Sequence, residues 1–212
     1  LSQILFYQLK LKSFQKAQLK NQWLVKYKEP ALNNNITIGI LGVGYLGSFV
    51  GKQLQKYGYN IIGFKNTKPK TNYSFPVFYK KSSIKKFLRQ SDVVACVLPS
   101  TSDTHHMVNR NFLNEMKKEA LLINVGRGST LHEKALIAHL KKYKKFYASL
   151  DVFENEPLST SSSLWKFPNV TITPHIASLT LVDTAVEYIY KKYQQYKKNG
   201  KIKSEVNLIK GY

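Results

Sequence analysis

A glycine-rich turn limits most strongly what this chain can fold into. Residues 36–41 form an apolar run rich in isoleucine, typical of a strand buried on both faces. The pattern then becomes Gly42-x-Gly44-x-x-Gly47, and residues 46–57 carry apolar side chains at helical spacing. Gly42 suits a tight turn, Gly44 allows close approach of a pyrophosphate, and Gly47 allows close helix packing. This order predicts dinucleotide binding at a helix N-terminus, with a glycine turn in another kind of α/β protein as the alternative.

Strands and helices alternate along the rest of the chain. The predicted strands are 61–64, 77–79, 92–98, 120–125, 147–150 and 170–173. The predicted helices are 2–21, 84–88, 111–118, 132–142 and 180–198, with a tail at 207–212. Ser82 or Ser83 is expected to cap the short second helix of this series. The alternation predicts an α/β fold with a doubly wound parallel sheet. Together with the glycine turn, it predicts a Rossmann-type NAD(P)-binding domain.

Composition narrows the class of protein. The 212 residues are 43% hydrophobic, enough for one packed domain and part of another. The single cysteine, Cys96, lies in an apolar run, which predicts a small core residue and excludes an intramolecular disulfide framework. No apolar run approaches the length of a membrane span, and no secretory signal is apparent, so we expect a cytoplasmic protein without membrane contact.

The charge is strongly basic, with 33 basic and 12 acidic residues and a net charge of +21. Such a balance suggests an anionic partner, either nucleic acid or a phosphorylated cofactor. The lysines are scattered along the chain, mostly on the polar faces of predicted helices, which favours a solvated lysine-rich surface. Because no helix-turn-helix, zinc spacing or aromatic-basic motif is apparent, neither nucleic-acid binding nor a metal site is expected.

In a doubly wound sheet, functional residues lie beyond the carboxyl ends of the strands. The candidates there are the glycine turn, the Lys65 loop, the Pro99 loop, Arg127, Asp151 with Glu154 and Glu156, and His175. Taken singly, Arg127 and Glu156 could face water and His175 could be structural. Together, an arginine, a carboxylate and a histidine could bind an anionic substrate, tune a proton donor and transfer a proton.

The loop after the second strand of the nucleotide-binding unit indicates which cofactor is bound. A free adenosine ribose normally meets an acidic residue about 20 residues beyond the glycine turn. Here that region reads Lys65-Asn66-Thr67-Lys68, and no acid occurs before Asp92. Positive charge with hydroxyl and amide donors suits a 2′-phosphate. The sequence therefore favours NADP(H), and NAD(H) stays open because a lysine-rich chain places lysines in many loops.

Several motifs together resemble a known family. They are GVGYLG at 42–47, LPSTSDT at 98–104, LINVGRG at 122–128, LDVFENEPL at 150–158, TPHIA at 173–177 and the ending KGY at 210–212. This set resembles the D-isomer-specific 2-hydroxyacid dehydrogenases, in particular their bacterial glyoxylate/hydroxypyruvate reductase branch. The resemblance covers nearly the whole chain.

The resemblance implies a role for each strand-end residue. Arg127 would hold a 2-oxo acid through its carboxylate and carbonyl, and His175 would protonate the carbonyl oxygen as hydride arrives. Glu156 would pair with His175 and favour its protonated form. Asp151 would accept a hydrogen bond from the nicotinamide carboxamide, and the Pro99 loop would line the cofactor. The expected cofactor contacts are Gly42, Gly44, Tyr45, Leu46, Gly47, Lys65, Asn66, Thr67, Lys68, Leu98, Pro99, Thr104, Val125, Gly126 and Asp151.

The resemblance also implies a domain organisation and a partner. We expect residues 1–35 to be a connecting helix and linker from a substrate-binding lobe whose N-terminal part is missing. Residues 36–178 would form the NAD(P)-binding domain, and 179–212 a return helix and tail packing toward that lobe. A homodimer is implied. The alternative is a dehydrogenase-fold binding or corepressor-like protein without turnover, but a binding module has no evident use for Arg127, Glu156 and His175 together. Which 2-oxo acid is reduced stays open.

Overall fold

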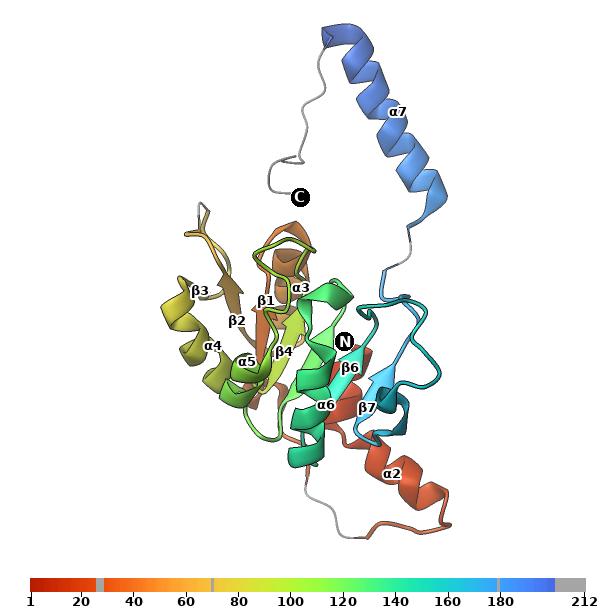
Figure 1. The fold of residues 1–212 in the computed structure, drawn as a ribbon. Helices are drawn as coiled ribbons and strands as arrows, with labels where there is room; N and C mark the ends of the chain where they lie inside the picture. Colours follow the sequence, from red (N-terminus) through yellow and green to blue (C-terminus); the bar gives the residue numbers. More distant parts are fainter. Residues whose placement is uncertain (26–28, 70, 179, 201–212) are drawn as a thin grey trace. The chain divides into compact units, whose positions relative to one another are not determined.

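The computed structural model describes residues 1–25, 29–69, 71–178 and 180–200. The chain divides after Pro174 into two units, and each is described by itself. The first unit contains a seven-stranded parallel sheet in the order β3-β2-β1-β4-β5-β6-β7 (Figure 1). This order confirms the predicted doubly wound sheet. It places β1 beside β4, where successive strands diverge to opposite sides.

The strands lie close to their predicted positions. They are β1 (Thr37–Leu41), β2 (Asn60–Lys65), β3 (Val77–Tyr79), β4 (Val93–Cys96), β5 (Leu121–Asn124), β6 (Tyr147–Leu150) and β7 (Val170–Ile172). The α-helices of the first unit are α1 (Ser2–Gln8), α2 (Leu11–Gln18), α3 (Tyr45–Lys56), α4 (Ile84–Gln90), α5 (Arg110–Glu115) and α6 (Glu133–Lys142). The short 3-10 helices among the described residues are η1 (Asn33–Asn35), η2 (Lys81–Ser83), η3 (Gly128–Thr130) and η4 (Ser163–Lys166). The second unit contains α7 (Val182–Asn199).

Two apolar layers cover the two faces of the sheet. On one face, α1 and α3 contribute Ile4 and Leu54. On the other face, α4, α5 and α6 contribute Leu88, Phe112 and Leu136 (Figure 1). Because both faces are covered, the central strands β1, β2, β4, β5 and β6 are mostly buried and read as continuous apolar runs. This is why their positions could be predicted. Cys96 is 1% exposed, as expected for a core residue, and burial raises the pKa of its thiol to about 12.

The N-terminal segment differs from its prediction. A single helix over 2–21 was expected, but two helices are separated at Lys10, which is left-handed with φ 53°. The side chain of Gln8 is buried, where it donates to the Ala31 carbonyl (2.8 Å) and accepts from the Tyr59 hydroxyl (2.6 Å). These bonds fix the end of α1 against the sheet, and the chain turns after it. Helical periodicity alone does not reveal such a polar anchor.

The predicted cap of α4 is correct in position and wrong in bonding. Ser83 is the N-cap residue, but it makes no side-chain cap hydrogen bond. Its hydroxyl instead donates to the carbonyls of Tyr79 (2.7 Å) and Lys80 (2.9 Å). The reason is that η2 leads directly into α4 and holds Ser83 in a helical conformation, whereas a capping residue is normally extended. The predicted tail at 207–212 lies outside the described residues.

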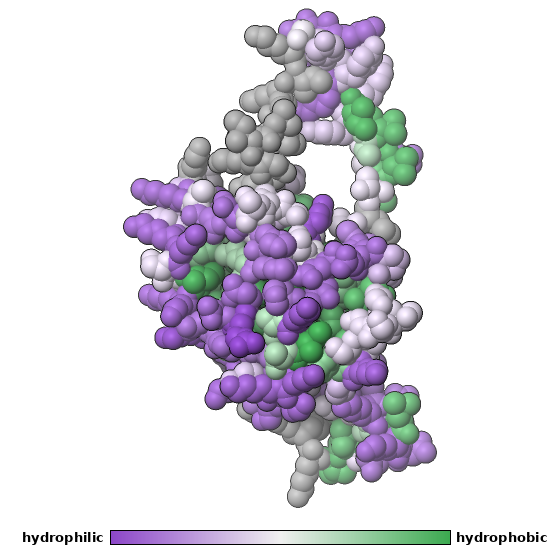
Figure 2. Space-filling view, in the orientation of Figure 1, coloured by the Kyte–Doolittle hydropathy of each residue, from purple (hydrophilic) through white to green (hydrophobic). Residues whose placement is uncertain are grey.

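The surface is mostly hydrophilic. Figure 2 shows hydrophilic side chains spread over much of the visible face of the first unit, with small hydrophobic areas between them. In the described part of the chain, no helix combines the length and apolar character needed to cross a membrane.

Candidate active site

The glycine turn joins β1 to α3 and has the geometry that its glycines predicted. Gly42 has φ +103°, a conformation that other residues rarely adopt. A Cβ on Gly47 would lie 2.1 Å from the Gly42 carbonyl oxygen, so only glycine lets the helix approach the turn this closely. A Cβ on Gly44 would meet no atom within 4 Å. The N-terminus of α3 is therefore open at Gly44, and Tyr45 and Leu46 face outward from its first turn.

Lys65 ends β2 on the side of the glycine turn. Its ammonium donates to the Tyr73 hydroxyl (3.3 Å) and lies 5.7 Å from the centre of that ring. Asn66, Thr67 and Lys68 follow and are exposed. Asn66 also borders a cavity of about 680 Å³ between the end of β2, α4 and α5. Its wall includes Phe64, Lys81, Ile84, Asp103, Met107 and Phe112.

The Pro99 loop follows β4 and is closed by one side chain. Thr104 is buried, its hydroxyl donates to the Pro99 carbonyl (2.6 Å), and it accepts from the Thr101 N–H (2.9 Å). Leu98 is also buried. Thr104 therefore shapes the loop from within, and contact of Thr104 or Leu98 with a cofactor stays a prediction.

The loop after β5 holds Arg127 between two glycines that pack on neighbouring backbone. A Cβ on Gly126 would lie 2.6 Å from the Leu98 carbonyl oxygen, and one on Gly128 would lie 1.8 Å from the Phe153 carbonyl oxygen. The loop thus packs tightly between the segments that follow β4 and β6. This fit fixes the backbone on both sides of Arg127.

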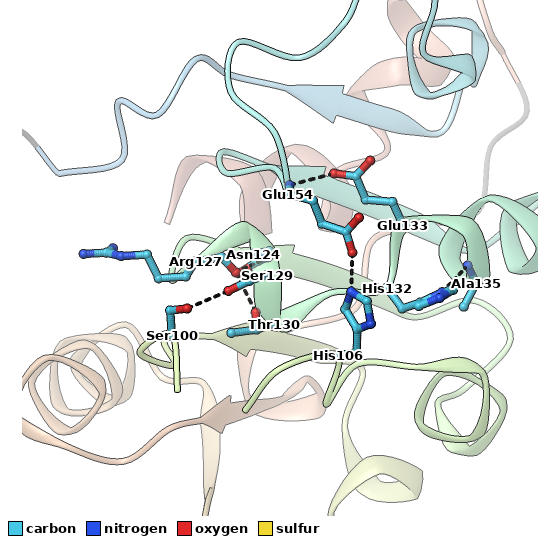
Figure 3. A network of polar contacts seen from close by, with 10 residues as sticks. All are labelled: Ser100, His106, Asn124, Arg127, Ser129, Thr130, His132, Glu133, Ala135 and Glu154. Carbon is cyan, nitrogen blue, oxygen red and sulfur yellow. Dashed lines mark hydrogen bonds and ion pairs between the residues drawn. The ribbon is translucent and has the colours of Figure 1, made fainter. Parts of the chain in front are cut away.

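Internal hydrogen bonds fix the backbone of this loop. The Arg127 carbonyl accepts from Thr130 Oγ1 (2.7 Å) and Asn124 Nδ2 (3.3 Å), while Asn124 Oδ1 accepts from the Gly126 N–H (3.3 Å). The Arg127 guanidinium donates to the Gly126 carbonyl (2.8 Å) and is exposed, extending away from the network in Figure 3. Val125, which precedes Gly126, is partly exposed at the same edge. A rigid backbone therefore presents an exposed cation.

The loop after β6 carries two carboxylates in different surroundings. Asp151 is 4% exposed, its N–H donates to the Asn124 carbonyl (3.0 Å), and its carboxylate accepts from the Thr173 hydroxyl. Glu156 is exposed, and its carboxylate accepts from the Phe153 N–H (2.9 Å). Asp151 is thus anchored to the Arg127 loop through Asn124, and Glu156 is folded back on its own turn.

His175 is the first residue of the second unit, and Arg127 and Glu156 belong to the first. It follows Pro174 in a left-handed conformation (φ 55°) and its side chain is exposed. The pairing of His175 with Glu156 stays a prediction.

A polar network joins three of these loops and was not predicted from the sequence (Figure 3). His106 pairs with Glu154, whose N–H donates to the Glu133 carboxylate (2.9 Å). The backbone N–H of His106 donates to the Ser129 carbonyl (2.9 Å). The hydroxyls of Ser129 and Ser100 are hydrogen-bonded to each other (2.8 Å). The signals in the sequence were the adjacent pair His105-His106 after the Pro99 loop and Glu154 among the strand-end candidates. Among the described residues, no cluster of His, Cys, Asp or Glu could hold a metal ion.

Comparison with known families decides the identity of this domain. Residues 1–177 match the NAD binding domain of the D-isomer specific 2-hydroxyacid dehydrogenases. The chain belongs to this family. The match confirms the resemblance read from the strand-end motifs, and it places the chain among oxidoreductases.

Individual members of the 2-hydroxyacid dehydrogenase family agree with this assignment. The glyoxylate/hydroxypyruvate reductase A of Escherichia fergusonii is 33% identical over 213 residues, which cover 100% of this chain and 67% of that protein. A D-isomer specific 2-hydroxyacid dehydrogenase from Xanthobacter autotrophicus, solved with NADPH and MES, is 32% identical with a TM-score of 0.91, covering 99% of this chain and 85% of that one.

An NADPH-dependent glyoxylate/hydroxypyruvate reductase from Sinorhizobium meliloti was solved with NADP and sulfate. It is 26% identical with a TM-score of 0.91, covering 100% of this chain and 67% of that one. The chain thus spans about two thirds of the length of this reductase and of the one from E. fergusonii.

Proposed function

We propose that this protein reduces a small 2-oxo acid, such as glyoxylate or hydroxypyruvate, to the 2-hydroxy acid with hydride from NADPH. The observation that carries the proposal is the fit of the Arg127 loop. Gly126 and Gly128 let this loop pack closely between the segments after β4 and β6. It lies at the carboxyl ends of the strands, the edge of the sheet that also carries the glycine turn. An arginine on a fixed backbone, at the same edge of the sheet as a nucleotide-binding turn, suits an anionic substrate that reacts with the nucleotide.

The residues of the glycine turn fit a dinucleotide. The open space at Gly44 would admit a pyrophosphate, and the N-terminus of α3 would supply N–H donors and a positive dipole end. Lys65, Asn66, Thr67 and Lys68 would surround the adenosine ribose, where positive charge favours a 2′-phosphate. Two solved relatives that contain NADPH or NADP support NADP(H) as the preferred cofactor, with NAD(H) as the alternative. When bound, the cofactor supplies the hydride.

The side chains would then complete the reduction at the carbonyl group. Arg127 binds the substrate carboxylate and carbonyl oxygen through the two arms of its guanidinium, which orients the carbonyl carbon. His175 donates its proton to the carbonyl oxygen as the carbon gains hydride, so the product is neutral at the new hydroxyl. Glu156 favours the protonated imidazole and fixes its orientation. A positioned acid of this kind contributes about 10²–10⁴ in rate.

A substrate and cofactor panel tests the proposal. The full-length protein is mixed with NADPH or NADH and a series of small 2-oxo acids, and loss of the reduced nicotinamide is followed by absorbance. We expect oxidation with glyoxylate or hydroxypyruvate, faster with NADPH than with NADH. Equal or faster rates with NADH would contradict the role given to the Lys65 loop. Tight cofactor binding with no reduction of any acid would favour the binding protein without turnover.

Two further features complete the proposal. We expect a homodimer formed through the cofactor domain, and a cytoplasmic location. Sedimentation equilibrium of the full-length protein tests the first, because a monomer at micromolar concentration would contradict it.

A further inference from the structure

Lys65 and the glycine turn are joined through one tyrosine. The Lys65 ammonium donates to the Tyr73 hydroxyl (3.3 Å), and that hydroxyl donates to the Val43 carbonyl (3.3 Å) inside the turn. Val43 lies between the two glycines that would receive the pyrophosphate. The Tyr73 hydroxyl thus uses its donor on the turn and its acceptor on the lysine. An ammonium has three donors, so this contact leaves others for a ligand.

Tyr73 is held in place by the packing of Phe75, two residues later. Phe75 is buried, and its ring fills the space left by two glycines: a Cβ on Gly51 of α3 would lie 2.5 Å from it, and one on Gly63 of β2 would lie 3.0 Å from it. The rings of Tyr73 and Phe75 are 6.1 Å apart. The segment bearing Tyr73 is therefore anchored in the core that supports the glycine turn.

A pair of reciprocal hydrogen bonds anchors the segment a second time, at Ser74, the residue between Tyr73 and Phe75 in the sequence. Ser74 donates its hydroxyl to Gln55 Oε1 (2.7 Å), and Gln55 Nε2 donates to the Ser74 carbonyl (3.1 Å). Gln55 belongs to α3, the helix that begins at the glycine turn. Tyr73 and the turn are consequently fixed to the same helix.

The alternation of side chains along β2 explains where Lys65 points. Phe64 and Asn66 line the cavity on the α4 and α5 side, so Lys65, between them, faces the glycine turn. Lys65 also occupies the end of β2, next to the first turn glycine, whose N–H bonds to the Phe64 carbonyl (2.9 Å). This is the place where an acid would meet a free ribose in an NAD-dependent protein.

We propose that Tyr73 is a positioning residue that fixes the Lys65 ammonium beside the glycine turn and so selects NADP(H) over NAD(H). The inference rests on the proposed function and deepens it, because it names the residue pair that recognises the 2′-phosphate. A free lysine side chain loses considerable rotamer entropy on binding a phosphate. Tyr73 restricts Lys65 before the ligand arrives, and pre-organisation of this kind raises affinity.

The test is the affinity of the full-length protein for each cofactor, measured by fluorescence titration with NADPH and with NADH. Tyr73→Phe keeps the ring and removes the hydroxyl. We expect it to raise the Kd for NADPH by about two- to tenfold, the effect of losing the bond to Lys65. The bond to Val43 is lost as well, but Phe75 and Ser74 still anchor the segment, so the Kd for NADH should stay unchanged. Lys65→Met should raise the Kd for NADPH by about tenfold or more. Adding Tyr73→Phe to Lys65→Met should then have no further effect on either cofactor.

Tyr79→Phe is the matched control, because Tyr79 also carries a lysine over its ring, Lys80 at 5.8 Å, but lies in β3 at the edge of the sheet. It should leave both Kd values unchanged. Tyr73→Phe would overturn the inference if it changed neither Kd or raised both equally, since the second result is what a purely structural tyrosine would give. If the wild-type protein bound neither NADPH nor NADH, the proposed function itself would fail and this inference with it.

Discussion

Arg127 combines a fixed backbone with an exposed guanidinium, and its fork should matter more than its charge. Lysine at this position keeps the charge but cannot make two parallel hydrogen bonds to a carboxylate and a carbonyl. We expect Arg127→Lys to raise the KM for the 2-oxo acid by about 10- to 100-fold, since two charge-assisted bonds are disturbed. The Kd for NADPH should not change. Steady-state kinetics with a parallel cofactor titration measure both, and an unchanged KM would remove Arg127 from the substrate site.

His139 makes stability depend on pH at a place remote from the proposed chemistry. It is 6% exposed in α6, between the rings of Tyr143 and Phe146, and its Nε2 has no hydrogen-bond partner among the described residues. Burial, assisted by the charge of Lys142, lowers the pKa of His139 from 6.5 to about 4. The folded protein therefore keeps this imidazole neutral where the unfolded chain would protonate it.

The sign of the effect follows from proton uptake. Between about pH 6.5 and 4, His139 binds a proton in the unfolded state but not in the folded state. The free energy of unfolding therefore falls as the pH drops toward 4. The slope from this group is at most about 1.4 kcal/mol per pH unit. We expect His139→Leu to show a shallower loss of stability over that window, measured by urea denaturation at several pH values. Identical slopes in the two proteins would contradict the assignment.

At the scale of elements, glycine has different roles in the glycine turn and in the Arg127 loop. One pair of variants distinguishes the two roles. Gly44→Ala adds a methyl group to open space. It should change stability by less than about 0.5 kcal/mol yet raise the Kd for NADPH at least about tenfold, because the methyl occupies the pyrophosphate position. Gly128→Ala drives a methyl into the Phe153 carbonyl and should cost about 1–3 kcal/mol of stability.

Thermal unfolding and cofactor titration of both variants give the answer. Equal loss of stability in the two proteins would mean that Gly44 has a packing role. Unchanged NADPH affinity in Gly44→Ala would remove the glycine turn from the cofactor site.

The strands and most helices could be predicted from the sequence because a sheet covered on both faces leaves uninterrupted apolar runs. The glycine uses at Gly42 and Gly47 could also be predicted, since each follows from local backbone sterics. The break at Lys10 could not, because it depends on the distant partners of Gln8. The network through His106 and Glu154 could not be predicted for the same reason, because its members lie on loops that come together only in the folded protein.

At the scale of the whole molecule, the second unit differs from the first in the exposure of its helix, α7. None of its 18 residues is buried, and Val182, Val186 and Ile189 share one face of the helix with exposures of 72%, 58% and 65%. The assignment of 179–212 to a return helix and tail packing toward a substrate-binding lobe stays a prediction, as does that of 1–35 to a connecting segment. The fold of the first unit and the family do not depend on either.

The charge of the whole chain gives a further prediction. The lysines are dispersed, and no recognition motif accompanies them, so the net charge of +21 should not produce tight binding to duplex DNA at physiological salt. Fluorescence anisotropy with a labelled duplex across a salt series measures this. Submicromolar binding with a steep salt dependence, together with no affinity for NADPH, would instead favour the corepressor-like alternative.

The most direct test of the account is the variant His175→Ala in the full-length protein, because His175 is the proposed proton donor. Turnover of NADPH with glyoxylate or hydroxypyruvate is compared with the wild type, and the Kd for NADPH is measured on the same samples. We predict that reduction falls by about 10²–10⁴ while the Kd for NADPH stays the same. Near-normal turnover in the variant would contradict the proposed mechanism.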